Sequence, residues 1–259
     1  MALPYTTGLT LWLDASQITG VADGATLATW PDMSGNGYNA TQATAGNDPL
    51  YYKTTASKLV NGLPAVWLTN GTTDYMATGA FAAALTTGTV FAVGAITDTG
   101  NNGILYDGIA GGNRWTMSGD GSGDIDMFQG IVLAWAQAVP TGVHQWTAQF
   151  LGTASSFARQ DGVLVATGNA GADTLTGVTL GQSPTGTQQD TGAIFCELLI
   201  YSPPLTGAQI ASVESYLHQK WFVPPASGGA LLLGAPGVMP ATVAGVRSAI
   251  LGRGSWVRP

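Results

Sequence analysis

Charged residues are scarce in this chain. They make up 9% of its 259 residues, against roughly 25% in an average globular domain. Apolar residues nevertheless reach 45%, so the chain can bury a core and its low charge does not indicate disorder. The shortage of Glu and Lys disfavours long helices, while 37 glycines suit many short strands joined by tight turns. The composition therefore favours a compact all-β protein.

Cysteine and long apolar runs are also nearly absent. Cys196 is the single cysteine, which excludes an intramolecular disulfide. Its place in the apolar run IFCELLIY indicates a buried side chain rather than a catalytic thiol. No apolar run is long enough to span a bilayer, and the first residues, MALPYTTGLTLW, lack the pattern of a secretory signal. We therefore expect a protein that is made in a cytoplasm and does not insert into a membrane.

Basic residues are few and unevenly placed. The chain has eight Lys or Arg, fifteen Asp or Glu, and a net charge of −7. Residues 225–259 contain three of the arginines and no acid, which leaves five basic residues against fifteen acids, or −10, in residues 1–224. An acidic body argues against nucleic acid as a partner, because phosphate contacts need clusters of Lys and Arg.

Four segments carry a family resemblance. They are LTLWLDAS at 9–16, the Gly-rich loop WPDMSGNGYNATQ at 30–42, NGLPAVWLTNGTTDYM at 61–76, and GAIFCELLIYSPPLTGAQIASVESYLHQKW at 192–221. This order of parts resembles LamG-like domains, the concanavalin A-like jelly rolls found in lectins, laminin modules and many phage and bacterial surface proteins. The resemblance implies a jelly-roll β-sandwich with one C-terminal packing helix. Domains of this kind usually bind or scaffold, and only some catalyse.

Local patterns place two strands and one hairpin turn more closely. The run TVFAVGAI at 89–96 is apolar on both faces and predicts an inner strand. Residues 144–151, HQWTAQFL, alternate between apolar and polar side chains, which predicts a strand with one buried and one wetter face. Asp161-Gly162, between two such runs, predicts a two-residue hairpin turn.

A helix closes the body, and the composition changes after it. Thr206 and Gln209 form a capping box, and apolar residues at helical spacing continue to about residue 221. We therefore expect a LamG-like domain over 1–224 and an extended arm over 225–259. Glycines interrupt the short apolar segments of the arm too often for it to form a core of its own, and the arm is too apolar for a solvated linker. We expect it to anchor the body on a neighbour through Leu231, Leu232, Leu233, Val243, Arg247, Ile250, Arg253, Trp256 and Arg258.

Carboxylates suited to catalysis are missing. Glucanases with this fold use a strand motif of the type Glu-x-Asp-x-x-Glu, and the nearest match here is GDIDMFQG at 123–130. Asp124 and Asp126 occupy the first two positions, but Gln129 replaces the acid. A retaining glycosidase needs two carboxyl groups, one of them protonated, and Gln129 cannot hold that proton. We therefore expect no catalytic residues.

Two kinds of binding site stay open. Asp32 and Asn36 in the Gly-rich loop offer the oxygen ligands that Ca²⁺ prefers, although the same side chains suit a structural loop in which they cap turns. Ca²⁺ is the one cofactor that the sequence suggests. Sugar binding needs exposed aromatic faces beside polar groups, and the candidates in the middle of the chain are Tyr106, Arg114, Trp115, Asp120 and Trp135.

These features together predict a binding or structural protein. We expect a lectin-like decoration or adhesion module of a phage-like virion, made in the host cytoplasm and attached to other virion proteins through residues 225–259. We also expect it to form a homo-oligomer and to contact cell-surface glycans. One alternative is a free carbohydrate-binding lectin, which saturable sugar binding by the body would favour. The other is a degenerate glucanase, which hydrolysis lost in Asp124→Ala would support.

Overall fold

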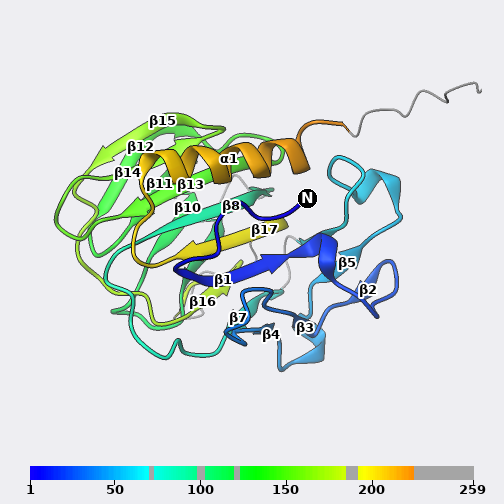
Figure 1. Ribbon diagram of the computed structural model, residues 1–259. Helices are drawn as coiled ribbons and strands as arrows, with labels where there is room; N and C mark the ends of the chain where they lie inside the picture. The colour runs from blue at the N-terminus through cyan, green and yellow to red at the C-terminus, as the bar shows by residue number, and fades with distance from the viewer. Residues whose placement is uncertain (70–72, 98–102, 120–122, 185–191, 225–259) are drawn as a thin grey trace, which may run out of the picture. The chain divides into compact units, whose positions relative to one another are not determined.

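Two antiparallel β-sheets form a sandwich in the computed structural model of the chain (Figure 1), which describes residues 1–69, 73–97, 103–119, 123–184 and 192–224. The nine-stranded sheet has the order β15-β14-β13-β8-β17-β6-β5-β2, with β1 also paired to β17. Its strands are β1 (Leu9–Asp14), β2 (Ala25–Thr26), β5 (Leu50–Tyr52), β6 (Ala65–Leu68), β8 (Gly88–Ile96), β13 (His144–Phe150), β14 (Ser156–Gln160), β15 (Val163–Gly168) and β17 (Ala193–Tyr201).

The second sheet has eight strands in the order β12-β11-β10-β9-β16-β7-β4-β3. Short 3₁₀ turns η1 (Ala15–Gln17), η2 (Ala45–Asn47) and η3 (Ala56–Lys58) interrupt the N-terminal third of the chain. The strands of this sheet are β3 (Thr29–Trp30), β4 (Ala40–Thr41), β7 (Met76–Thr78), β9 (Ile104–Gly108), β10 (Thr116–Gly119), β11 (Asp124–Phe128), β12 (Val132–Ala138) and β16 (Val178–Leu180). The predicted all-β sandwich is confirmed.

Strands β8 and β17 are buried on both faces because each lies between two packed layers. In β8, Val90 packs into the core between the sheets, whereas Phe91 packs into a second cluster beneath the helix. Every residue of both strands is buried. The inner strand predicted over 89–96 is therefore confirmed, and Cys196 on β17 is fully buried, as expected.

The helix α1 (Gly207–Trp221) lies across the outer face of the nine-stranded sheet (Figure 1). Its N-terminus has the predicted capping box: the Thr206 hydroxyl accepts from the Gln209 backbone N–H, and the Gln209 side chain accepts from the Thr206 backbone N–H. Its buried side chains share the second apolar cluster with Phe91 and Leu199. The predicted closing helix over 207–221 is confirmed.

The helix also changes the environment of β13. The alternation in 144–151 predicted a wetter face, but Gln145, Thr147 and Gln149 are only 3%, 1% and 8% exposed. Helix α1 packs on β13, and the Thr147 hydroxyl donates to Glu214 Oε1 at 2.9 Å. The prediction of a wetter face is wrong, because alternation separates the two faces of a strand without showing what covers the second one.

A tight hairpin joins β14 to β15. Asp161 and Gly162 have φ angles of 50° and 78°, which a type I′ turn requires at both central positions, so the predicted hairpin is confirmed. Strand β15 ends the nine-stranded sheet. Its first two residues, Val163 and Leu164, are 66% and 57% exposed. This end of the sheet therefore presents apolar side chains to solvent.

The predicted arm over 225–259, with all of its proposed anchoring residues, lies outside the described residues. Within the described ranges, no helix has the length and apolarity needed to cross a membrane.

Candidate binding pocket

A β-bulge at Thr10 shapes the surface beside the first strand. The register between β1 and β17 shifts between Leu9 and Leu11, so Thr10 is an extra residue in the ladder. A bulge leaves such a residue outside the regular pairing and redirects its side chain. The Thr10 carbonyl oxygen instead accepts a hydrogen bond of 2.9 Å from Asn36 Nδ2. The bulge therefore joins β1 to the Gly-rich loop.

Asp32 organises that loop and fastens it to β1. Its Oδ1 atom accepts from the backbone N–H of Trp12 at 3.0 Å and of Ser34 at 2.9 Å. Its Oδ2 atom accepts from the Ser34 hydroxyl at 2.8 Å and from the Tyr38 backbone N–H at 2.9 Å. A Ca²⁺ ion at Asp32 would have to displace these protein donors.

The contacts of Asp32 and Asn36 are those of a structural loop. The Asn36 amide nitrogen donates to the carbonyl oxygens of Leu9 and Thr10 at 3.0 and 2.9 Å. Among the residues that the structure describes, no group of three or more His, Cys, Asp or Glu could hold a metal ion. Ca²⁺ binding at Asp32 and Asn36 stays a prediction, and the observed contacts do not require it.

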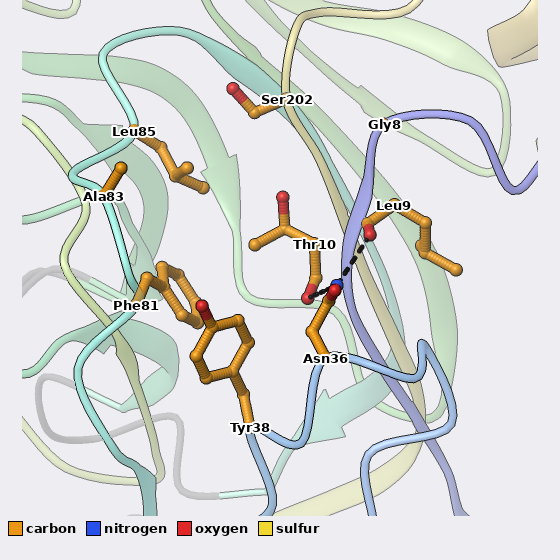
Figure 2. Close-up of a pocket in the computed structure, with 9 residues that line it drawn as sticks. All are labelled: Gly8, Leu9, Thr10, Asn36, Tyr38, Phe81, Ala83, Leu85 and Ser202. Atoms are coloured by element: carbon orange, nitrogen blue, oxygen red, sulfur yellow. Dashed lines mark hydrogen bonds between the residues drawn. The ribbon is translucent and has the colours of Figure 1, made fainter.

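The loop forms one wall of a cavity of about 270 Å³ (Figure 2). The opposite wall comes from the segment between β7 and β8, and the start of β1 forms the floor. None of the lining side chains carries a charge. The lining residues are Gly8, Leu9, Thr10, Asn36, Tyr38, Phe81, Ala83, Leu85 and Ser202. The cavity is slightly smaller than typical small-molecule sites of roughly 300–1,000 Å³, so it has room for one small ring.

Two aromatic rings and three neutral polar side chains define the chemistry of this cavity. The Tyr38 and Phe81 rings pack at 4.8 Å between centroids, and the Tyr38 hydroxyl accepts from the Ala82 backbone N–H at 2.8 Å. Figure 2 shows the Thr10 hydroxyl directed into the space between these walls. The Ser202 hydroxyl donates to a backbone carbonyl at 3.0 Å and keeps its lone pairs as acceptors. The cavity therefore suits a neutral ligand with an apolar face and hydroxyl groups.

The sugar-binding candidates chosen from the sequence do not gather around this cavity. Tyr106 and Trp115 are 1% and 0% exposed, so their ring faces are closed to solvent. The Trp115 ring stacks on Phe150 at 4.7 Å within the core. Asp120 lies outside the described residues, and of Trp135 only the backbone, in β12, is described. Sugar binding at these positions stays a prediction, but Tyr106 and Trp115 offer no platform in this structure.

Arg114 has a structural partner. Its guanidinium forms hydrogen bonds with both carboxylate oxygens of Asp107, at 2.5–3.1 Å. These hydrogen bonds raise the pKa of Arg114 further above its usual value. The Asp107 side chain is fully buried, whereas 26% of the Arg114 side chain is exposed. Arg114 therefore neutralises a buried carboxylate.

The glucanase-like segment is also structural. Gln129 is fully buried, and its amide nitrogen donates to the carbonyl oxygens of Thr86 and Asp173 at 3.1 and 3.0 Å. Asp126, on β11, accepts from the Ser118 hydroxyl at 3.1 Å. Gln129 thus ties three separate backbone segments together, because its amide oxygen also accepts from the Gly152 N–H.

Sequence reasoning missed Thr10, Tyr38 and Phe81 as cavity residues. Tyr38 lies within the Gly-rich loop that the resemblance had already selected, so its position was a usable signal. Phe81 carried no signal, because it is 43 positions away from Tyr38 and meets it only in the fold.

Solved structures share the fold of this chain. The binding domain of botulinum neurotoxin serotype D aligns with a TM-score of 0.57 and 11% identity, over 82% of this chain and 51% of that one. The binding domain of Paraclostridial Mosquitocidal Protein 1 aligns with a TM-score of 0.56 and 12% identity, over 83% and 53%. Trypanosoma rangeli sialidase in complex with the inhibitor DANA aligns with a TM-score of 0.52 and 13% identity, over 82% and 33%.

The chain thus spans about half the length of the two binding domains and a third of the sialidase. At these identities the likeness shows the fold alone. No protein-family model matches the sequence, and no curated protein matches it. The resemblance to LamG-like domains stays a prediction, while the β-sandwich that it implied is confirmed.

Proposed function

We propose that the protein is a non-catalytic binding module whose cavity beside β1 takes one neutral sugar residue. The observation that carries this proposal is the uncharged lining, which brings the packed Tyr38 and Phe81 rings and the Thr10 and Ser202 side chains to one cavity. Aromatic carbon accepts the apolar face of a sugar ring, and hydroxyl groups bind its polar edge. The proposal also draws support from the fold, because two similar structures are binding domains of other proteins.

The non-catalytic part of the proposal rests on Gln129. Its side chain is buried and held by three backbone segments, and an amide cannot protonate a leaving oxygen. In the segment that comes nearest to a glucanase motif, residues 123–130, Gln129 therefore has a structural role. This argument favours the binding module over the degenerate glucanase.

Filling the cavity should abolish sugar binding. Ala83 lines the cavity and is exposed, so Ala83→Trp would block the site without removing a core contact. Neutral sugars such as glucose, galactose and N-acetylglucosamine would be titrated into the full-length protein by calorimetry or followed by ligand-observed NMR. We expect millimolar binding by at least one of them, and binding at least about tenfold weaker in Ala83→Trp.

The neighbouring residue offers a matched control. Ala84 is also exposed and does not line the cavity, so Ala84→Trp should bind like the unchanged protein. Thr10→Val, which removes one hydroxyl at nearly constant volume, should weaken binding by about three- to tenfold. Equal affinities for Ala83→Trp and Ala84→Trp, or no binding of any neutral sugar, would reject the proposal.

We further propose that this module is displayed on a phage-like virion and is held there by residues 225–259. The support is the composition of that segment, which has three arginines, no acid and several aliphatic residues, together with the resemblance to modules common on phage surfaces. The free-lectin alternative shares the sugar site but needs no attachment. The two differ in how the full chain assembles.

Assembly should therefore depend on the C-terminal arginines. We expect the full chain to sediment as an oligomer well above its 26.4 kDa mass, and to dissociate as salt is raised because surface ion pairs are screened. Reversing Arg247, Arg253 and Arg258 to Glu should weaken the oligomer in the same way. A full chain that sediments as a monomer at every salt concentration would favour the free lectin.

A further inference from the structure

We infer a second ligand pocket, on β5 and β6, that binds the ring and the acidic group of an anionic sugar. It is a separate cavity of about 210 Å³, and it shares no residue with the cavity beside β1. Its lining combines two aromatic rings, one lysine, two aliphatic side chains and two threonines. The lining residues are Leu50, Tyr52, Lys58, Trp67, Leu68, Thr69 and Thr97.

The strand pairing and a 3₁₀ turn place the aromatic rings and the lysine together. Leu50 on β5 lies opposite Trp67 on β6, and the Tyr52 and Trp67 rings meet edge to face at 6.1 Å. The turn η3 ends at Lys58, whose carbonyl oxygen accepts from Trp67 Nε1 at 3.0 Å. This hydrogen bond fixes the backbone of Lys58 beside the indole.

The ammonium group of Lys58 is held on the aromatic rings. Its Nζ atom lies 3.9 Å from the Trp67 ring centroid and 5.6 Å from the Tyr52 ring centroid. Such cation–π contacts stabilise the charge without supplying an oxygen acceptor for its N–H groups. A lysine held in this way has already lost much of the side-chain freedom that ligand binding would otherwise restrict.

Lys58 differs from the other basic residues near buried groups. Arg114, Arg159 and Lys220 each form an ion pair with at least one carboxylate. No described carboxylate forms such a pair with Lys58. In a body that carries −10 over residues 1–224, a cation that forms no ion pair with any carboxylate in the described part of the chain is available to an anionic ligand.

The other lining groups select the kind of anion. A free inorganic anion would use only the ammonium group. The half-buried Tyr52 and Trp67 rings offer apolar contact to a ligand ring, and the exposed Thr69 and Thr97 stand at the same cavity. A sugar with a carboxylate or sulfate group matches all three features, since its ring packs on carbon and its acidic group meets Lys58.

The test compares ligands that keep one feature at a time. Glucuronate has both the ring and the charge, glucose has only the ring, and acetate has only the charge. We expect the full-length protein to bind glucuronate at least about tenfold more tightly than either of the others. Glucose 6-sulfate carries a sulfate in place of the carboxylate of glucuronate. Binding of either of these two acidic sugars supports the inference. Higher salt should weaken the binding.

Lys58→Met is the decisive variant, because methionine keeps an unbranched apolar side chain over the rings and removes the charge. Its matched control is Lys53→Met, which changes the net charge equally. Lys53 lies outside the cavity, and its ammonium donates to the Val21 carbonyl oxygen at 2.6 Å. We expect glucuronate affinity to fall at least about tenfold, to the level of glucose, in Lys58→Met and to stay unchanged in Lys53→Met.

Four results would each overturn the inference. They are glucuronate bound no better than glucose, acetate bound as tightly as glucuronate, equal glucuronate affinity in the two lysine variants, and no binding of either glucuronate or glucose 6-sulfate. The result is separable from the neutral-sugar proposal, because Ala83→Trp should leave glucuronate binding unchanged. Lys58→Met should likewise leave neutral-sugar binding unchanged.

Discussion

Lys220→Met should lower the free energy of unfolding by about 3–5 kcal/mol, the usual cost of removing one partner from a buried ion pair. Lys220 Nζ lies 2.6 Å from Asp14 Oδ2 and 2.8 Å from Glu197 Oε2. The side chains of Asp14 and Glu197 are 1% and 0% exposed. Without the ammonium group, two carboxylates would remain together in the core with no cation. Urea unfolding followed by fluorescence would measure the loss.

Glu197 connects the cluster of Lys220, Asp14 and Glu197 to three further side chains through hydrogen bonds. Its Oε1 atom accepts from Trp12 Nε1 at 2.8 Å and from the Tyr216 hydroxyl at 3.0 Å. Its Oε2 atom also accepts from Trp221 Nε1 at 2.7 Å. The cluster therefore joins β1, β17 and α1. The control is Lys53→Met, because Lys53 is exposed and has no carboxylate partner among the ion pairs described. This variant should lower the free energy of unfolding by less than about 1 kcal/mol.

The loss caused by Lys220→Met should shrink in acid. Burial, followed by the charge of Asp14, raises the pKa of Glu197, and Lys220 opposes this shift. Removing Lys220 should raise that pKa further. A carboxyl group with a raised pKa in the folded state penalises folding above that pKa and stops doing so as the pH falls toward its ordinary value of 4.5. A difference between the two proteins that is constant from neutral pH to pH 4.5 would contradict this account.

Arg114→Met is the second large expected effect, with a loss of about 2–4 kcal/mol in the free energy of unfolding. Arg114 bonds both oxygens of Asp107, whose side chain is fully buried. The Thr116 hydroxyl at 2.7 Å and the Gly108 backbone N–H would be its remaining donors. We expect Arg114→Lys to be intermediate, since lysine keeps the charge and loses the forked geometry.

A double-mutant cycle separates the structural role of Arg114 from the predicted sugar contact. In the Asp107→Asn background the buried charge is gone, so Arg114→Met should cost clearly less than it does alone. Sugar affinity at the cavity beside β1 should not change, because Arg114 does not line it. A stable Arg114→Met protein that has lost sugar binding would instead restore Arg114 as a binding residue.

Local patterns account for the elements that the sequence predicted well. The capping box at Thr206 and the Asp161-Gly162 hairpin each depend on residues a few positions apart, so their geometry follows from short-range bonding alone. The inner strand over 89–96 followed from an apolar run. The sandwich itself came from a family resemblance that covered most of the body.

Long-range packing decided the positions where sequence reasoning failed. Trp115 follows a Gly-rich stretch that is typical of an exposed loop, yet its ring packs on Phe150 in the core. Gln149 belongs to the polar face of an alternating strand, yet it lies under the helix and donates to the Leu205 carbonyl oxygen at 2.7 Å. Both outcomes depend on which distant segment covers the residue, and periodicity contains no information about that.

The hydrogen bonds between the Asp32 loop and β1 have a consequence for aggregation. The Trp12 N–H donates to Asp32 and the Trp12 carbonyl oxygen accepts from Met33, so the main chain of β1 at Trp12 has no free bonding groups to offer another polypeptide. Strand β15 ends the same sheet, with Val163 and Leu164 exposed, and no described contact binds a loop to it in the same way. Strand β15 is therefore open to strand addition by another molecule, and weakening the Asp32 loop would also expose the main chain of β1 to such pairing.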